Sequence, residues 1–331
     1  MRVLIVGCGS IGTRHLRNLW DLGIRDIVVT DVRLDRLTEL QRLFGVKTVG
    51  DFDEALAMEP DVVFVTVPTH LHIPLALKAA QFGCHLFIEK PLSHTMVGVD
   101  ELINLVQQKK LVTLVGCNMR FHYGPSTIER LLRRNAIGKV VSAHLEAGQY
   151  LPDWHPWEDY RQGYSAHQEM GGGVILDCIH EIDYARWLFG EVREVFCFGG
   201  KLSSLEIDTE DCVNIVMKFN VGFSATVHLD YVQRTYARSC KVIGEEGTIL
   251  WDIADGTVRY YSADRKNWTL FKPLGSYDLN QMYIEELRHF LRCLEGKERS
   301  AQDIREAKRV LEIALAIRES MHRGQKVIVR S

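Results

Sequence analysis

The 331-residue sequence contains no C-x-x-C pair, no cluster of basic residues and no internal repeat. It also has no run of about 18 apolar residues, so no membrane-spanning helix is expected. Lysine and arginine number 40 against 43 acidic residues, a formal net charge of −3, which argues against nucleic acid as a partner. No Cys and His quartet has zinc-ligand spacing, so no metal site is expected. The charge balance leaves small anionic ligands open, because they need only one or two donors.

The eight cysteines lie mostly in apolar runs, where a free thiol behaves as a small buried hydrophobe. This usage indicates a reduced protein without a disulfide framework. The short apolar run 3–6 ends in glycine and does not resemble a signal peptide. We therefore expect a cytoplasmic location.

The first part of the chain alternates short β-branched runs with amphipathic helical patterns. Such alternation predicts βαβ units, and continuous apolar strands predict a parallel sheet covered on both faces. The fold class is therefore α/β, with a parallel sheet in residues 1–119. The expected strands are 2–6, 26–30, 61–67, 85–89 and 111–117, and the expected helices are 11–22, 33–44, 74–82 and 97–109.

The pattern changes near residue 120, where strand-like segments joined by short turns become frequent. Successive strands with tight turns, such as one at Val221 and Gly222, predict an antiparallel sheet with helices on one face. Residues 120–331 are therefore expected to form a second, α/β domain. Its expected strands are 139–149, 192–200, 210–219, 222–232, 238–244, 247–252 and 327–329, and its expected helices are 126–135, 173–189, 279–295 and 302–322.

Residues 7–12 match G-x-G-x-x-G between an expected strand and an expected helix. Gly7 permits a tight turn, Gly9 lets a pyrophosphate approach the backbone, and Gly12 lets the helix pack on the strand. The helix amino end at Ser10 and Ile11 would offer free N–H groups to the phosphates. The alternative is a glycine-rich turn without a ligand.

Asp31 ends the second expected strand, 19 residues after Gly12. A carboxylate there accepts hydrogen bonds from a ribose 2′-OH and repels a 2′-phosphate, which favours NAD(H). Arg33 and Arg36 leave NADP(H) open, because an arginine can hold the 2′-phosphate. Alternatively, Asp31 is the N-cap of the following helix.

Three further segments of the sequence are distinctive. They are TVPTHLH at 66–72, EKPL at 89–92, and GGG at 171–173 leading into DCIHEID at 177–183. Together with the glycine loop, in this order along nearly the whole chain, they resemble the Gfo/Idh/MocA family of oxidoreductases. NMRF at 118–121 and IGKV at 137–140 are also similar to that family's pattern.

The resemblance implies a doubly wound Rossmann domain followed by an α/β domain with a large open, mostly antiparallel sheet through which dimers or tetramers form. It implies hydride transfer between a nicotinamide cofactor and a carbohydrate substrate. The cofactor contacts that it adds are Thr66, Pro68, His72, Glu89 and Lys90, and the substrate contacts are Asn118 and Arg120.

Oxidation of a secondary alcohol requires a group that removes the hydroxyl proton. By resemblance, Lys90 orients or polarises the reacting oxygen, His180 transfers the proton, and Asp177 holds His180 or a substrate hydroxyl. In many members the aspartate precedes the histidine by four residues, whereas here the spacing is three; both spacings put the two residues on one face of a helix. The alternatives are a surface lysine, a core histidine and an ordinary helix-face carboxylate.

Residues 150–161 contain four aromatic residues and two prolines. We expect a loop that binds substrate, with Trp154 stacking on a sugar face, Arg161 binding an anionic group, and Tyr164 nearby. The alternative is an oligomer contact or a packed structural loop.

The sequence therefore predicts an NAD(P)-dependent dehydrogenase acting on a sugar, sugar phosphate or nucleotide sugar, with a role in surface-sugar biosynthesis. Two other functions stay open. One is a nicotinamide-binding sensor of the same fold without turnover, and the other is a reductase of a non-carbohydrate carbonyl.

Overall fold

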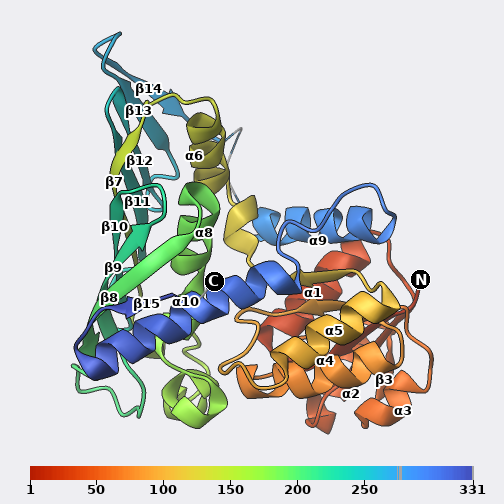
Figure 1. Cartoon of the computed structure of the whole chain (residues 1–331). Helices are drawn as coiled ribbons and strands as arrows, with labels where there is room; N and C mark the ends of the chain where they lie inside the picture. Colours follow the sequence, from red (N-terminus) through yellow and green to blue (C-terminus); the bar gives the residue numbers. More distant parts are fainter. Residues whose placement is uncertain (274, 276–277, 330–331) are drawn as a thin grey trace. The chain divides into compact units, whose positions relative to one another are not determined.

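The computed structural model of the chain (Figure 1) describes residues 1–273, 275 and 278–329. Its contacts group the chain into two compact units. The first comprises Met1–Cys117 and Tyr283–Lys308, and the second Asn118–Met282 and Arg309–Ser331. Residues 283–308, which the sequence pattern assigned to the second domain, thus group with the first unit.

The first unit contains a six-stranded sheet in the order β3-β2-β1-β4-β5-β6 with every pair parallel. The expected doubly wound sheet is confirmed. All four residues of β1, β2 and β4 are buried, as a sheet covered on both faces requires. The strands are β1 (Val3–Val6), β2 (Ile27–Thr30), β3 (Lys47–Val49), β4 (Val62–Val65), β5 (His85–Ile88) and β6 (Thr113–Val115), and the helices are α1 (Ser10–Asp21), α2 (Leu34–Phe44), α3 (Phe52–Leu56), α4 (His72–Gln81) and α5 (Val99–Lys109).

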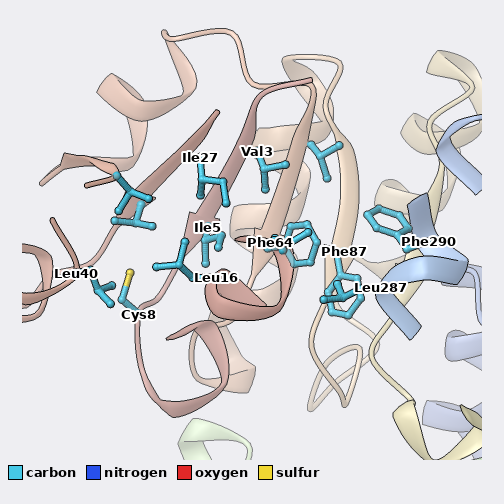
Figure 2. Close-up of a cluster of buried hydrophobic side chains, with 14 of the residues drawn as sticks. Val3, Ile5, Cys8, Leu16, Ile27, Leu40, Phe64, Phe87, Leu287 and Phe290 are labelled. Atoms are coloured by element: carbon cyan, nitrogen blue, oxygen red, sulfur yellow. The ribbon is translucent and has the colours of Figure 1, made fainter. Parts of the chain in front are cut away.

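One face of this sheet packs against α1, α2 and a helix from the far end of the chain, α9 (Asn280–Leu294). Figure 2 shows Leu287 and Phe290 of α9 beside the rings of Phe64 and Phe87. The latter two rings are stacked with centroids 4.6 Å apart, and Phe290 meets both edge-on. This apolar contact ties α9 to the first unit, and the bonds of Val115 N–H to the carbonyl of Gln302 and of Ile304 N–H to Thr113 Oγ1 tie the residues that follow it.

The second unit contains a nine-stranded sheet in the order β14-β13-β12-β11-β7-β10-β9-β8-β15. Only β10 and β7 pair in parallel, so the expected mostly antiparallel sheet is confirmed. Alternate residues of β9 are buried, and α6 and α8 lie along one face of the sheet (Figure 1). The strands are β7 (Val140–Gly148), β8 (Val192–Gly200), β9 (Cys212–Phe219), β10 (Ser224–Asp230), β11 (Ala237–Gly244), β12 (Gly247–Asp252), β13 (Val258–Ser262), β14 (Asn267–Phe271) and β15 (Val327–Ile328), and the helices are α6 (Tyr123–Arg133), α7 (Val174–Asp177) and α8 (Ile179–Phe189). A further helix, α10 (Ile304–Arg323), begins in the first unit and continues into the second from Arg309.

The structure departs from the sequence expectations at a few elements. The short β3 and α3 and the hairpin of β13 and β14 were not expected from the pattern. The expected helix 173–189 is two helices, because Cys178 has φ −92° and ψ 32° and interrupts the helical hydrogen bonding. The expected turn at Val221 and Gly222 is confirmed, with Gly222 at φ +99°.

Within the described residues, none of the helices is long and apolar enough to cross a membrane. All eight cysteines are described, and each is a free thiol.

His122 is the N-cap of α6, and its burial leads to a prediction about stability in acid. Its buried Nδ1 atom accepts a hydrogen bond from the backbone N–H of Gly124 at 3.0 Å. Burial, assisted by the positive charge of Arg238, lowers the pKa of His122 to about 4 from 6.5. Below pH 6.5 the unfolded chain therefore binds a proton that the folded chain does not, and stability falls as the pH falls towards 4.

We expect His122→Asn, which keeps an acceptor for Gly124 N–H, to remove this part of the acid sensitivity. At about pH 5 the histidine contributes roughly 2 kcal/mol of destabilisation relative to neutral pH. Urea unfolding at neutral pH and at about pH 5 measures the difference. An unchanged pH dependence in the variant would contradict the assignment.

Candidate active site

The glycine loop joins β1 to α1 by a path that only small residues allow. A Cβ atom on Gly12 would lie 2.0 Å from the carbonyl oxygen of Gly7 and 2.8 Å from Thr66 Oγ1. Gly7 itself has φ +89°, in the left-handed region that favours glycine. The start of α1 is therefore packed directly on the ends of β1 and β4.

The amino end of α1 is open where a phosphate would bind. Gly9 is the N-cap and provides no side-chain hydrogen bond, and a Cβ atom there would meet no atom within 4 Å. The first N–H groups of a helix, here from Ser10 and Ile11, lack intrahelical acceptors and carry partial positive charge. These residues fit the pyrophosphate of a dinucleotide.

Asp31 follows β2 and lies beside the glycine loop. Its Oδ2 atom accepts the backbone N–H of Cys8 at 2.5 Å, and its Oδ1 atom accepts that of Arg33 at 2.8 Å. The N-cap of α2 is Arg33, so the alternative that Asp31 is this N-cap is wrong. The Arg33 guanidinium forms an exposed ion pair with Asp35 at 2.8 Å. The carboxylate is thus fixed at the loop, where a ribose would be recognised.

Thr66 and Pro68 follow β4 at the same edge of the sheet. Thr66 is buried, and its Oγ1 atom lies 2.7 Å from the carbonyl oxygen of Gly7 and 2.9 Å from that of Val6. Thr66 therefore holds the glycine loop against the sheet. Pro68 is the N-cap of the 3-10 helix η1 (Thr69–Leu71).

Lys90 lies at the carboxyl end of β5, half-buried and between two buried residues, Glu89 and Pro91. The pairing of Val6 with Val65 and of Val65 with Ile88 aligns the ends of β1, β4 and β5. The loops that follow these adjacent strands therefore emerge at one edge of the sheet. Sequence reasoning placed Lys90 and the glycine loop in one site, and the topology brings them to the same edge.

The third motif differs from the sequence expectation. Asp177 is the last residue of α7, whereas His180 is in the first turn of α8. The expectation that both lie on one face of a single helix is wrong, because Cys178 separates the two helices. His180 is 7% exposed and Asp177 is 3% exposed.

Buried donors from other elements bind the acidic residues of this motif. Tyr231 donates its hydroxyl to Asp177 Oδ2 at 2.5 Å, and burial raises the pKa of Tyr231 well above 10, so that it keeps this proton. Two ion pairs complete the set: Arg238 Nε lies 2.8 Å from Glu181 Oε1, and Arg120 Nη2 lies 2.7 Å from Asp183 Oδ1. Sequence reasoning missed Tyr231 and Arg238, since nothing in the local pattern pairs residues so distant.

A glycine fixes the start of this motif. Gly173 has φ +106°, and a Cβ atom there would lie 2.4 Å from Glu210 Oε1. Glu210 in turn forms an ion pair with Arg318 of α10 at 2.9 Å. The glycine run therefore lets the chain pass close to this pair before α7 begins.

The expected substrate residues have different surroundings. Asn118, in the 3-10 helix η2 (Asn118–Phe121), is 4% exposed, and within the described part of the chain its Oδ1 atom has no hydrogen-bond partner. Arg120 is buried and uses two donors, Nε and Nη2, on Asp183. Asn118 Oδ1 is therefore an acceptor that the described residues leave unused, whereas Arg120 joins η2 to α8.

The aromatic segment forms short 3-10 turns, among them η3 (Leu151–Asp153), η4 (Tyr160–Gln162) and η5 (Tyr164–Ala166). Trp154 meets the Tyr231 ring edge-on with centroids 5.3 Å apart, and its Nε1 atom donates to the carbonyl of Gln149 at 3.2 Å. Arg161 is exposed and pairs with Asp159 and Glu206 at 2.9 and 2.8 Å. Tyr164 is half-buried at the start of η5. Trp154 thus contacts the tyrosine that holds Asp177.

The proposed catalytic residues divide between the two units: Lys90 lies in the first, and Asp177 and His180 lie in the second. Over residues 1–273, 275 and 278–329, no group of three His, Cys, Asp or Glu side chains is arranged to hold a metal ion. Sequence reasoning also missed His15 of α1, which lies 2.7 Å from Glu89. The signal was a histidine three residues after Gly12 within an apolar helix face.

The fold and this site define an NAD-binding oxidoreductase, and comparisons with known proteins identify the family. Residues 1–117 match the family model described as "Oxidoreductase family, NAD-binding Rossmann fold". Residues 126–250 match "GFO/IDH/MocA C-terminal domain". The chain belongs to the GFO/IDH/MocA oxidoreductase family.

Several relatives match over almost their whole length. A myo-inositol 2-dehydrogenase from Thermotoga maritima is 29% identical, with 99% of this chain and 98% of the relative covered. A scyllo-inositol 2-dehydrogenase (NAD(+)) from Bacillus subtilis is 25% identical, with 99% and 96% covered. The solved structure of a levoglucosan dehydrogenase in complex with NADH has a TM-score of 0.91 at 21% identity and covers 100% of this chain and 99% of that one. The last likeness shows the fold.

Two glycine variants test the cofactor loop. Gly9→Ala adds a Cβ atom that meets nothing within 4 Å in the protein, so we expect unchanged stability but weaker NADH binding, because the methyl group occupies the approach of the pyrophosphate. Gly12→Ala, whose Cβ atom would lie 2.0 Å from Gly7 O, should destabilise the fold. Nicotinamide fluorescence titration and thermal unfolding measure both effects. Unimpaired NADH binding by Gly9→Ala would contradict the assigned phosphate position.

A second prediction concerns the choice of cofactor. Asp31→Asn keeps an acceptor for Cys8 N–H but removes the charge that opposes a 2′-phosphate. We expect the preference for NADH over NADPH to fall by about tenfold or more, since like-charge juxtaposition costs several kcal/mol. Fluorescence titrations with both cofactors measure the ratio. A ratio equal to that of the unaltered protein would show that Asp31 does not discriminate.

Proposed function

We propose that this protein is an NAD-dependent dehydrogenase that oxidises a secondary hydroxyl group of a free sugar or cyclitol to a ketone. The observation that carries the proposal is the position of Lys90. It follows β5 at the sheet edge where the glycine loop and Thr66 follow the adjacent strands β1 and β4. An amine at the edge that binds NAD is suited to act on the oxygen of the carbon that is oxidised.

NAD supplies the acceptor for the hydride that leaves the substrate carbon. In the proposed reaction, the Lys90 ammonium donates a hydrogen bond to the reacting oxygen and orients it. His180 accepts the hydroxyl proton, because an imidazole can both accept and release a proton near neutral pH. Asp177, fixed by the Tyr231 hydroxyl, offers its carboxylate to a neighbouring substrate hydroxyl.

Three observations support a polyhydroxylated substrate. Two relatives that match along almost the whole chain are named as inositol dehydrogenases, and among the described residues the buried amide oxygen of Asn118 has no hydrogen-bond partner. Trp154, whose ring packs on Tyr231, provides an aromatic surface of the kind that stacks on sugar faces. A sugar phosphate or nucleotide sugar, a role in surface-sugar biosynthesis, and assembly into dimers or tetramers through the nine-stranded sheet stay predictions.

The test uses Lys90→Ala. We expect turnover to fall by about a hundredfold or more, as loss of an acid–base or polarising group produces, with NADH still bound. Turnover of myo-inositol, scyllo-inositol, glucose and a nucleotide sugar with NAD+ is followed as NADH absorbance. Lys109→Ala, which removes an exposed lysine bonded to the carbonyl of Gln81, is the matched control.

Normal turnover in Lys90→Ala would refute the role of this lysine. Firm NADH binding without turnover on any polyol or carbonyl of a wide panel would instead favour a nicotinamide-binding sensor. Activity restricted to non-carbohydrate carbonyls would show that the protein is an enzyme but that its substrate is not a sugar or cyclitol.

A further inference from the structure

Both neighbours of Lys90 in the chain are hydrogen-bonded to buried histidines. His15 of α1 contacts the side chain of Glu89, and His72 of α4 contacts the carbonyl group of Pro91. The two histidines are 0% and 1% exposed. We propose that His15 and His72 are positioning residues that fix the peptide segment carrying Lys90, and this inference rests on the proposed role of that lysine.

On the amino-terminal side, one carboxylate connects a helix to the backbone of the lysine. His15 Nε2 lies 2.7 Å from Glu89 Oε1, and Glu89 Oε2 accepts the backbone N–H of Lys90 at 3.1 Å. A carboxylate has no hydrogen to donate, so the Nε2 atom carries the hydrogen of this bond. Glu89 is 6% exposed, and a buried carboxylate is strongly disfavoured unless such donors surround it. Glu89 is thereby held in one position.

Aromatic rings enclose His15 and restrict its motion. The Phe87 ring lies edge-on with its centroid 4.8 Å from that of His15, and those of Phe64 and Tyr283 lie at 5.6 and 6.2 Å. His15 also lies one helical turn beyond Gly12, in the helix whose amino end faces the pyrophosphate site. The helix that binds the cofactor therefore also holds Glu89.

On the carboxyl-terminal side, His72 joins two loops that follow adjacent strands. Its Nδ1 atom lies 2.8 Å from the carbonyl oxygen of Pro91, and its Nε2 atom lies 2.9 Å from that of Val67. Val67 follows β4 and Pro91 follows β5, so the ring lies between the backbones of the two loops. Burial lowers the pKa of His72 and favours the neutral ring, whose single N–H donates to one of these two carbonyls. Moving that loop would leave the N–H and its carbonyl unpaired, which apolar packing alone would not penalise.

An apolar core alone does not require two histidines at these points. His15 lies among phenylalanine rings, where leucine or phenylalanine would bury more apolar surface, and its other ring nitrogen, Nδ1, has no hydrogen-bond partner in the described residues. Such a buried unpaired atom costs stability. The gain is placement of Lys90: displacement of a reacting group by about 1 Å lowers rates by about a hundredfold.

The experiment compares His15→Ala, His72→Ala and the control His85→Asn. His85 lies at the opposite end of β5 and accepts the backbone N–H of Val112 at 2.9 Å, so this control replaces a histidine that bonds the backbone away from Lys90. The kcat is measured with NAD+ and the best substrate of the panel above. We expect it to fall about ten- to a hundredfold in both His15→Ala and His72→Ala. In His15→Ala the KM for NAD+ and the Kd for NADH should change little, and His85→Asn should keep its kcat.

A second measurement tests, independently of activity, whether His15 holds Glu89 and the backbone of Lys90 in place. Amide hydrogen exchange of the peptide that contains Lys90, whose N–H is bonded to Glu89, should accelerate in His15→Ala. If His15→Ala does not fold, Glu89→Gln tests the same contact, and His15→Gln, which retains an N–H donor, should recover part of the kcat. Unchanged exchange, or faster exchange with unchanged kcat, would overturn the inference. If Lys90→Ala is itself fully active, the proposed role of Lys90 fails. Amide hydrogen exchange then still tests whether His15 fixes the segment that carries Lys90.

Discussion

The close approach between the start of α1 and the ends of β1 and β4 is the constraint on which the first unit depends. Gly12 leaves no space for a Cβ atom against Gly7, and the Thr66 hydroxyl reaches the same carbonyl. This contact directs the amino end of α1 at the phosphate site and also brings His15, one turn later, under the EKP segment. The proposed cofactor site and the placement of Lys90 therefore derive from one packing contact. The glycine loop, the segment 66–72 and the EKPL segment are separate in the sequence but are parts of one structure.

Much of the fold could be predicted because its signals are local. Fully apolar strands alternating with amphipathic helices specify the parallel sheet, and the period-two pattern of β9 specifies a sheet with one covered face. The assignment of residues 283–308 could not be read in this way. The amphipathic face of α9 is visible in the sequence, but the surface that it covers, near Phe64 and Phe87, is known only from the tertiary contacts. The break at Cys178 was likewise hidden, since apolar residues on both sides continue a helical pattern.

The candidate site shows the same division. The glycine loop, Asp31 and Lys90 were visible because each ends a recognisable strand. In contrast, the sequence could not tell a carboxylate that serves the scaffold from one that serves chemistry. In the run 177–183, Glu181 and Asp183 each pair with a buried arginine, and Asp177 accepts the hydroxyl of Tyr231. Because those partners lie up to 63 residues away, spacing alone carries no record of them.

These pairings also explain why the motif is so rich in charge. Burying an ion pair contributes little net stability compared with apolar packing, but removing one partner is strongly destabilising. Glu181 and Asp183 therefore restrict α8 to one orientation, in which His180, in the first turn of that helix, is almost completely buried. In the first unit, Glu89 has the same effect on Lys90 through a single carboxylate. In both units, buried polar contacts that add little stability determine where an ionisable side chain lies, and the proposed roles of Lys90 and His180 require this precision.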